Sequence, residues 1–479
     1  MSARVRFAPS PTGYLHIGGA RTAIYNYLFA KANNGTLILR IEDTDLERSK
    51  REYEVLQVAD LKWLGIEFDE SPEKPGKYGP YRQSERTDIY LKYAQMLVDK
   101  GLAYYDFCTD AELEAMKERA TQEGRPPHYD GKWKNEKYWE EAQAKLAAGE
   151  KGAIRFKASQ KSYILNDRVR GRIVFPENMV GDFVLIRSNG QPVYNFCCVV
   201  DDMLMKITHV IRGEDHLSNT LRQMMLYEAF DATIPEMVHV SLLIGNDRQK
   251  LSKRHGATSV NLYREESYAP QALVNYLCLL GWSHPEEKDI FTLQEIAPVF
   301  NLDRFSKSPA IYDIEKLKWV NGQHLRKIDN EILVKQLDAF IDSGHWFHKQ
   351  PHDWKIACIA LFKEQIQFFQ EIIPHLEALH SKELVRDEKL NEILSWPTTP
   401  QIAAFLSKEL EQIKTHYVEA ATFNQWMDKI KTELKIKGKP LFMGVRVSLT
   451  GHDHGPELNQ LIPLTPVDVL KARVKNLLT

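Results

Sequence analysis

The chain has 479 residues, of which 43% are hydrophobic and 27% are charged, and its net charge is −2. At roughly 100–200 residues per domain this length predicts about three or four domains of a soluble, folded protein. The near-neutral charge excludes a uniformly basic nucleic-acid binder, although a local basic patch can still bind phosphates. Five cysteines without a CxxC pair favour a reducing cytoplasm over a disulfide framework. No signal peptide or membrane-spanning apolar run is found.

The first elements predict the beginning of a parallel α/β sheet. Residues 5–8 form a short strand, and a turn rich in Pro and Gly follows at residues 9–13. A helix is expected from about Gly18 to Ala32, because apolar residues recur there every four positions. Asn-Asn-Gly at residues 33–35 ends it, and the apolar segment at residues 36–45 is the next strand. Strand, helix and strand in this order are typical of a parallel sheet.

The middle and the end of the chain differ from this beginning. Residues 81–175 are charged and rich in aromatics, which indicates an insertion between two halves of the sheet domain. The sheet is expected to resume at residues 181–188, 207–213 and 238–245. From about residue 325 onward, apolar residues at spacings of three and four predict only helices, and the change falls near residues 317–327.

The first motif with chemical meaning is RFAPSPTGYLHIGG at residues 6–19. A strand ends, the chain turns, and a helix begins at two glycines, so a ligand can approach the backbone closely. The helix N-terminus favours anions, and His16 beside it can donate to a phosphate oxygen. Taken alone, His-x-Gly-Gly also fits a glycine turn with a surface histidine.

The second motif is KLSKR at residues 250–254, after a predicted strand and turn. Two lysines three residues apart in a loop can follow a polyphosphate as its charge shifts, because Lys is a compact point charge. A single KxxK is more often a solvated basic loop, so the motif carries weight only beside the first one.

Together, in this order, the two motifs resemble the HIGH and KMSKS signatures of class I aminoacyl-tRNA synthetases. Further segments resemble bacterial-type glutamyl-tRNA synthetases: RIEDTD (40–45), KWLGIEFDE (62–70), GPYRQSER (79–86), NYLCLLGWS (275–283) and KLKWVNG (316–322). The resemblance is strongest over residues 4–325. Both signatures are imperfect, since the chain reads HIGG and KLSKR.

The resemblance implies a Rossmann-type α/β parallel-sheet catalytic domain, an inserted α+β domain that binds the tRNA acceptor end, and an all-α C-terminal anticodon-binding region. The expected boundaries are 1–80 and 181–255 for the two catalytic halves and 81–180 for the insertion. A stem-contact helical domain is expected at 256–325, and the anticodon-binding domain at 326–479.

The implied reaction joins L-glutamate to ATP and then transfers it to the 3′-terminal adenosine of tRNA-Glu. His16, Lys250 and Lys253 are the expected catalytic residues. The resemblance places ATP at Pro9, His16, Gly18, Gly19, Asp215, Lys250, Leu251, Ser252, Lys253 and Arg254, with His216 nearby. It places glutamate at Arg6, Ala8, Ser10, Glu42, Tyr194 and Arg212. Arg binds carboxylates bidentately, and an acid is needed for the ammonium group.

For tRNA, the resemblance implies that Tyr81, Arg82 and Arg86 contact the acceptor region. Mg²⁺ is expected with ATP, held mostly by phosphates and water. A structural zinc ion is not expected, because only Cys108 remains where some relatives have several ligands. We therefore predict no metal-binding residues, a cytoplasmic monomer, and no membrane partner.

Four alternatives stay open from the sequence. Glutaminyl-tRNA synthetases differ at the segments APSPTG and RIEDTD. The short paralogue that glutamylates a tRNA base lacks the helical C-terminal region, and other nucleotidyltransferases of the superfamily lack the insertion as well. A non-catalytic tRNA-binding relative would not need His16, Lys253 or the arginines and the glutamate of the expected amino-acid pocket, and all of these are present. Whether tRNA-Gln is also charged depends on the helical domain.

Overall fold

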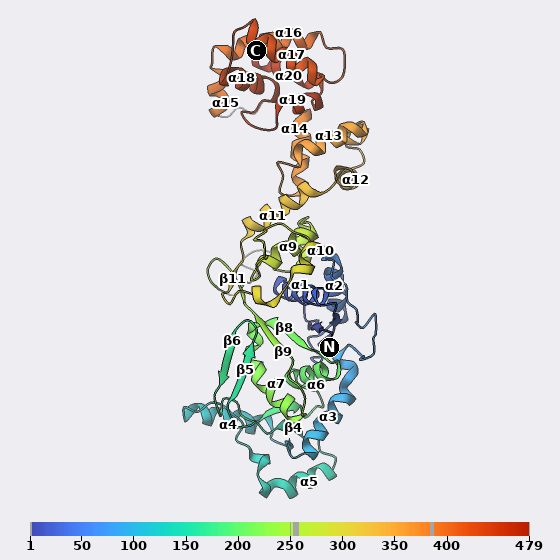
Figure 1. The fold of residues 1–479 in the computed structure, drawn as a ribbon, viewed down its shortest axis with the longest axis vertical. Coiled ribbons are helices and arrows are strands. Elements are labelled where there is room, and N and C mark those ends of the chain that lie inside the picture. Colours follow the sequence, from blue (N-terminus) through green and yellow to red (C-terminus); the bar gives the residue numbers. More distant parts are fainter. Residues whose placement is uncertain (1, 250, 252–257, 384–387, 479) are drawn as a thin grey trace. The chain divides into compact units, whose positions relative to one another are not determined.

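The structure is a computed structural model that describes residues 2–249, 251, 258–383 and 388–478. It divides into two compact units, Met1–Val320 and Asn321–Thr479, whose elements are labelled in Figure 1. No described helix is long and apolar enough to cross a membrane.

The first unit begins with the predicted strand, helix and strand. β1 (Arg4–Phe7) and β2 (Thr36–Leu39) pair in parallel with Arg4 opposite Thr36. α1 (Ile17–Ala32) crosses between them and packs against both strands. It ends where predicted, because Asn34 adopts a left-handed conformation with φ of 47°.

A second parallel pair extends this arrangement. β8 (His209–Gly213) pairs with β9 (Glu236–Val240), and α6 (Tyr194–Leu204) and α7 (Leu217–Ala229) pack on each other. β8 lies beside β1, where the Thr208 amide donates to the Arg4 carbonyl at 2.9 Å. The carboxyl ends of β1, β2 and β8 therefore lie close together, and this edge is where open α/β sheets bind ligands. The predicted α/β parallel-sheet class is confirmed.

The segment between the two halves forms antiparallel sheets. One has the order β3 (Ala103–Asp106), β4 (Ala153–Phe156), β7 (Phe183–Ile186), and the other is the hairpin of β5 (Tyr163–Asp167) and β6 (Gly171–Phe175). The helices here are α3 (Thr87–Asp99), α4 (Asp110–Gln122) and α5 (Trp139–Ala147).

The prediction that the parallel sheet resumes at residues 181–188 is wrong, because β7 pairs with β4 in the antiparallel sheet. Its apolar run identifies a buried strand but carries no information about its partner.

Further helices and a short parallel strand pair also belong to the first unit. They are α2 (Arg51–Trp63), α8 (Val260–Glu265), α9 (Pro270–Leu279), α10 (Leu293–Ile296) and the parallel pair β10 (Leu243–Ile244) and β11 (Ala310–Ile311). α11 (Ile314–Lys327) contains the boundary between the two units.

The described part of the second unit is helical, as predicted. Its helices are α12 (Asn330–Phe340), α13 (His352–Phe362), α14 (Ile372–His380), α15 (Glu388–Leu394), α16 (Thr398–Glu411), α17 (Ala420–Thr432), α18 (Lys439–Thr450), α19 (Leu458–Leu461) and α20 (Val467–Leu478). The apolar faces recognised in the sequence meet in two cores, for example Ile402, Leu406 and Leu410 around the buried Trp426.

Candidate active site

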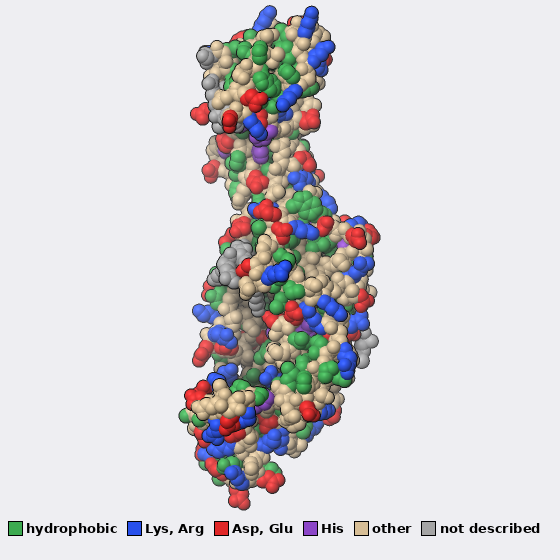
Figure 2. Space-filling view, turned by 90° about the vertical axis from the view of Figure 1, so that its left-hand side faces the viewer, with side chains coloured by type: hydrophobic (Ala, Val, Ile, Leu, Met, Phe, Trp, Pro, Cys, Tyr) green, Lys and Arg blue, Asp and Glu red, His purple; other side chains and the backbone are tan. Residues whose placement is uncertain are grey.

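A cavity of about 840 Å³ opens at the carboxyl ends of the parallel strands. In Figure 2 the face of the first unit turned to the viewer is hollowed, with basic and acidic side chains around the hollow. Lys250, Ser252, Lys253 and Arg254 lie outside the described residues. All the other predicted ATP and glutamate residues line the cavity: Arg6, Ala8, Pro9, Ser10, His16, Gly18, Gly19, Glu42, Tyr194, Arg212, Asp215 and Leu251.

One end of the cavity is formed by the N-terminus of α1. His16 is the N-cap residue, and its Nδ1 accepts a hydrogen bond of 3.1 Å from the Gly18 amide. In the neutral ring the proton then resides on Nε2, which is the nitrogen that can donate to an anion. A Cβ at Gly18 would lie 3.3 Å from Nδ1, so a side chain there would crowd this contact. The helix N-terminus and its histidine therefore suit a phosphate.

The other end of the cavity contains a buried arginine that has no acidic partner among the described residues. Arg212 is 5% exposed, and its Nη1 has no hydrogen-bond partner among the described residues. Its other nitrogens are held by neutral acceptors: Nε donates to His239 Nε2 at 3.1 Å, and Nη2 donates to Thr220 Oγ1 at 2.8 Å and Gln223 Oε1 at 2.7 Å. A buried guanidinium edge left open in this way suits an incoming carboxylate.

The remaining charged groups beneath the cavity balance one another. Arg6 Nε lies 3.1 Å from Asp202 Oδ1, and Arg40 reaches both Asp202, at 2.6 Å, and Glu42, at 3.1 Å. Burial opposes ionisation of Asp202, but Arg6 and Arg40 outweigh it and lower the pKa of this carboxyl. For Glu42 burial dominates and raises the pKa despite Arg40 and Arg6. Glu42 can thus offer a carboxylate to an ammonium group that compensates for its burial.

Tyr194 and His216 form a neutral pair across the same end. A hydrogen bond of 2.9 Å joins the Tyr194 hydroxyl to His216 Nδ1. Burial raises the pKa of Tyr194, whereas burial and the positive charge of Arg212 lower the pKa of His216 to about 4. Both groups are therefore uncharged near neutral pH and do not neutralise Arg212.

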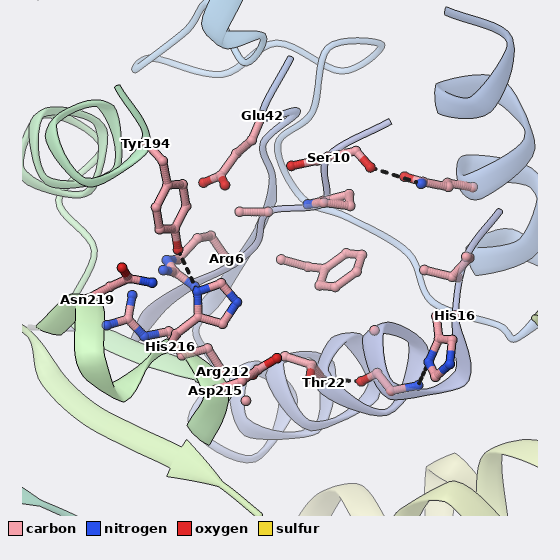
Figure 3. Close-up of a pocket in the computed structure, with 18 of the residues that line it drawn as sticks. Arg6, Ser10, His16, Thr22, Glu42, Tyr194, Arg212, Asp215, His216 and Asn219 are labelled. Carbon is pink, nitrogen blue, oxygen red and sulfur yellow. Dashed lines mark hydrogen bonds between the residues drawn. The ribbon is translucent and has the colours of Figure 1, made fainter. Parts of the chain in front are cut away.

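Figure 3 shows how these groups are distributed. Glu42, Tyr194, Arg6, Arg212 and His216 converge on one side of the cavity, and His16 lies on the opposite side at the start of α1. The cavity can thus hold an amino acid with a negative side chain next to an anionic group such as a phosphate.

Comparison with known proteins identifies the family. Residues 2–319 match the family model for tRNA synthetases class I (E and Q), catalytic domain, and residues 292–478 match an anticodon binding domain. The chain belongs to the class I tRNA synthetases for glutamate and glutamine. The resemblance inferred from the sequence motifs is confirmed.

Individual relatives are similar to this synthetase over its full length. A glutamate–tRNA ligase of Carboxydothermus hydrogenoformans is 44% identical over 485 residues, which cover 99% of each chain. Glutamate–tRNA ligase 1 of Fervidobacterium nodosum is 44% identical and covers 98% of each chain. A solved glutamate tRNA ligase from Elizabethkingia meningosepticum, in complex with its amino acid, has a TM-score of 0.88 at 32% identity and covers 100% of this chain and 99% of that chain.

The residues predicted to contact tRNA occupy unexpected positions in this synthetase. Tyr81 and Arg86 are only 1% and 2% exposed. Tyr81 donates to Glu70, and Arg86 Nε binds Asp201 at 2.7 Å. This burial does not agree with the predicted contact with tRNA, because almost none of either residue is accessible to a binding partner. Arg82, 16% exposed, pairs with Glu54.

Several residues of the site lie outside the motifs recognised in the sequence. His239, Thr220 and Gln223 hold Arg212 but belong to no recognised motif. Asp202 was also missed, although two adjacent acids at positions 201–202 within an apolar helix are a usable signal. Such acids are almost never buried unless paired, so they indicate buried cations nearby.

Proposed function

We propose that this synthetase activates L-glutamate with ATP and transfers the glutamyl group to tRNA-Glu in translation. The observation that carries this proposal is the open, buried edge of Arg212, which has no ion pair with a described carboxylate. A glutamate side chain supplies the missing negative charge. Glutamine would leave the guanidinium uncompensated in a buried site, and its binding is therefore disfavoured.

The other pocket residues have complementary roles in this proposal. Arg6 and Arg212 hold the substrate carboxylate, Glu42 binds the ammonium group, and Tyr194, Ser10 and Ala8 shape the pocket around them. Two observations support these roles. All of these residues line one cavity, and the acidic Glu42 and the basic arginines carry charges opposite to those of the ammonium and carboxylate groups of glutamate.

In the first step an oxygen of the glutamate α-carboxylate attacks the α-phosphorus of ATP. The bond to the bridging oxygen breaks, pyrophosphate leaves, and glutamyl-adenylate forms. His16 donates to a phosphate oxygen, with Pro9, Gly18, Gly19, Asp215 and Leu251 around the nucleotide. Lys250, Ser252, Lys253 and Arg254 are proposed to bind the phosphates on sequence grounds alone. Catalysis then consists of positioning and of stabilising phosphate charge.

In the second step the 2′-hydroxyl of the terminal adenosine attacks the glutamyl carbonyl, and AMP leaves with its bonding electrons. Residues 81–180 are proposed to meet the acceptor end, 256–325 the stem and 326–479 the anticodon. Mg²⁺ accompanies ATP through phosphate and water ligands. The protein is proposed to act as a cytoplasmic monomer.

The test is the charging of purified tRNA-Glu and tRNA-Gln, side by side, with labelled glutamate or glutamine. We expect glutamate to be esterified to tRNA-Glu in an ATP-dependent reaction and glutamine to be rejected. The reaction with tRNA-Gln determines whether the enzyme discriminates between the two tRNAs. Equal charging with glutamine, or no charging with glutamate, would refute the proposal.

A further inference from the structure

The orientation of Arg212 depends on a buried histidine behind it. His239 lies on β9, directly opposite Arg212 in the parallel register of β8 and β9, and it is 0% exposed. Its Nε2 accepts from Arg212 Nε at 3.1 Å, and the Thr220 hydroxyl lies 3.1 Å from the same nitrogen. His239 does not line the cavity, so it can act on a substrate only through Arg212.

The direction of these hydrogen bonds follows from the chemistry of arginine. A guanidinium has donors and no acceptor, so His239 Nε2 must present its lone pair to Arg212. The ring proton therefore resides on Nδ1, which lies 2.6 Å from Asp167 Oδ2. Asp167 is thus the acceptor that keeps the imidazole in the tautomer that Arg212 requires.

Asp167 is itself firmly placed. It lies at the end of β5, where its Oδ1 accepts from the Val169 and Arg170 amides at 2.9 and 2.8 Å, and its Oδ2 accepts from the His239 amide at 3.1 Å. Figure 1 shows the β5–β6 hairpin beside β8 and β9, and β5 contacts β9 directly. The turn that closes this hairpin therefore also orients the histidine.

Because the group that contacts Arg212 is an imidazole, the positive charge of Arg212 is retained. A carboxylate in contact with Arg212 would neutralise it and occupy the guanidinium edge that a ligand needs. The neutral ring of His239 fixes Arg212 Nε without neutralising the guanidinium charge. The carboxylate of Asp167 lies on the far side of that ring. We propose that His239, held in its tautomer by Asp167, is a positioning residue that orients Arg212 toward the substrate carboxylate; this inference rests on the proposed function.

Two replacements of His239 separate its Nδ1 contact with Asp167 from its Nε2 contacts with Arg212 and Thr220. His239→Asn places an amide near the position of Nδ1, so it can still donate to Asp167 but offers nothing to Arg212. His239→Gln reaches the position of Nε2, so its oxygen can accept from Arg212. His209→Asn is the matched control, because His209 lies on the adjacent strand β8 and outside the cavity.

The measurement is steady-state charging of tRNA-Glu by the full chain, with glutamate and ATP varied separately. We expect His239→Asn to raise the glutamate KM by about 10- to 100-fold, the range that follows from losing one hydrogen bond to a charged group. The ATP KM should stay unchanged, and His239→Gln should lie between His239→Asn and the wild type. A glutamate KM equal to that of His209→Asn, or an equal rise in both KM values, would overturn the proposal.

A second measurement needs no variant to be active. Two-bond ¹H–¹⁵N correlation spectra of the wild type, labelled at histidine, report the tautomer of each ring. The His239 signal, assigned through His239→Asn, should show a proton on Nδ1 and none on Nε2, whereas the opposite tautomer would refute the arrangement. A wild type that charges no glutamate would instead refute the proposed function, whatever the tautomer.

Discussion

Arg6 and Arg212 lie in the same cavity, but their charges are balanced differently. Arg6 faces Asp202, and this pairing raises its pKa against the effect of burial. Within the part of the chain that the structure describes, Arg212 is held only by neutral groups. Removing a cation that a buried acid needs is destabilising, whereas Arg212 can be replaced without stranding a protein carboxylate. Arg212 is therefore the better residue for testing substrate recognition.

The lowered pKa of His216 predicts a pH dependence of stability. Its pKa falls from 6.5 to about 4 on folding, because of burial and then Arg212. Between these values the unfolded chain binds a proton that the folded chain does not, so stability declines as the pH falls. The variant His216→Asn lacks the hydrogen bond to Tyr194, which lowers its stability. It also lacks the ionisable group, so it does not lose stability in acid through this residue. The difference in Tm between wild type and variant, measured by thermal unfolding, should therefore narrow from pH 7 to pH 4.5.

His454→Asn is the control for this comparison, because the His454 side chain is 86% exposed. Its Tm should follow that of the wild type at every pH. A difference for His216→Asn that stays constant or widens in acid would contradict the assignment of a depressed pKa.

Among the secondary-structure elements, α3 and α6 are joined by a buried polar network around Asp201. Asp201 is 0% exposed and accepts from Arg86 Nε at 2.7 Å, Tyr90 at 2.8 Å and Gln83 at 2.9 Å. Arg40 Nε lies 3.6 Å away. The network connects the GPYRQSER segment to the helix that carries Asp202, beneath the cavity.

Asp201→Asn should destabilise the protein by about 3–5 kcal/mol, since it leaves two buried guanidinium groups with too little negative charge. Urea or thermal unfolding measures this loss. Asp99→Asn, an exposed position on α3, should change stability by no more than about 0.5 kcal/mol. A loss of less than about 1 kcal/mol at Asp201 would show that the network matters little to stability.

The insertion contains a cluster of side chains around Cys108. Asp106 forms an ion pair with Arg155 and accepts from Tyr129 at 3.3 Å, and the Arg155 guanidinium lies over the Tyr129 ring at 4.1 Å. Cys108 Sγ lies 3.6 Å from the Tyr129 hydroxyl, and burial raises the pKa of its thiol to about 11. Among the described residues no three His, Cys, Asp or Glu side chains are arranged to hold a metal ion.

A chelator should therefore leave the Tm of the protein unchanged, because direct contacts connect these side chains without a metal. The measurement is thermal unfolding with and without excess EDTA, with added Zn²⁺ as the reciprocal condition. A drop in Tm with EDTA that Zn²⁺ reverses would show that a structural metal is present.

On the scale of the whole molecule, the sequence predicted the architecture better than the pairing of distant residues. The β1–α1–β2 unit and the helical region after residue 325 follow from local periodicity and turn residues, which the chain itself displays. The partner of β7 could not be predicted in this way, because it depends on a strand about 30 residues earlier.

The same distinction applies to the site. The cavity residues before and within α1 are contiguous in the sequence, so a motif could place them. Arg86 reaches Asp201 across 115 positions, and Asp167 reaches His239 across 72. Single-sequence patterns carry no record of such contacts. Arg86 therefore resembled an exposed tRNA contact, and His239 resembled an ordinary strand residue.

Arg212 is the residue proposed to recognise the glutamate side chain. The decisive measurement is the ratio of kcat/KM for glutamate to that for glutamine, in the wild type and in Arg212→Gln. Arg304→Gln, an exposed position in the same unit, is the control. The wild type and the control should prefer glutamate by at least about 10⁴-fold, as sites built to bind a polar group do. Arg212→Gln should lower this preference by at least about 100-fold, which corresponds to roughly 3 kcal/mol. A preference that is unchanged in Arg212→Gln would contradict the account.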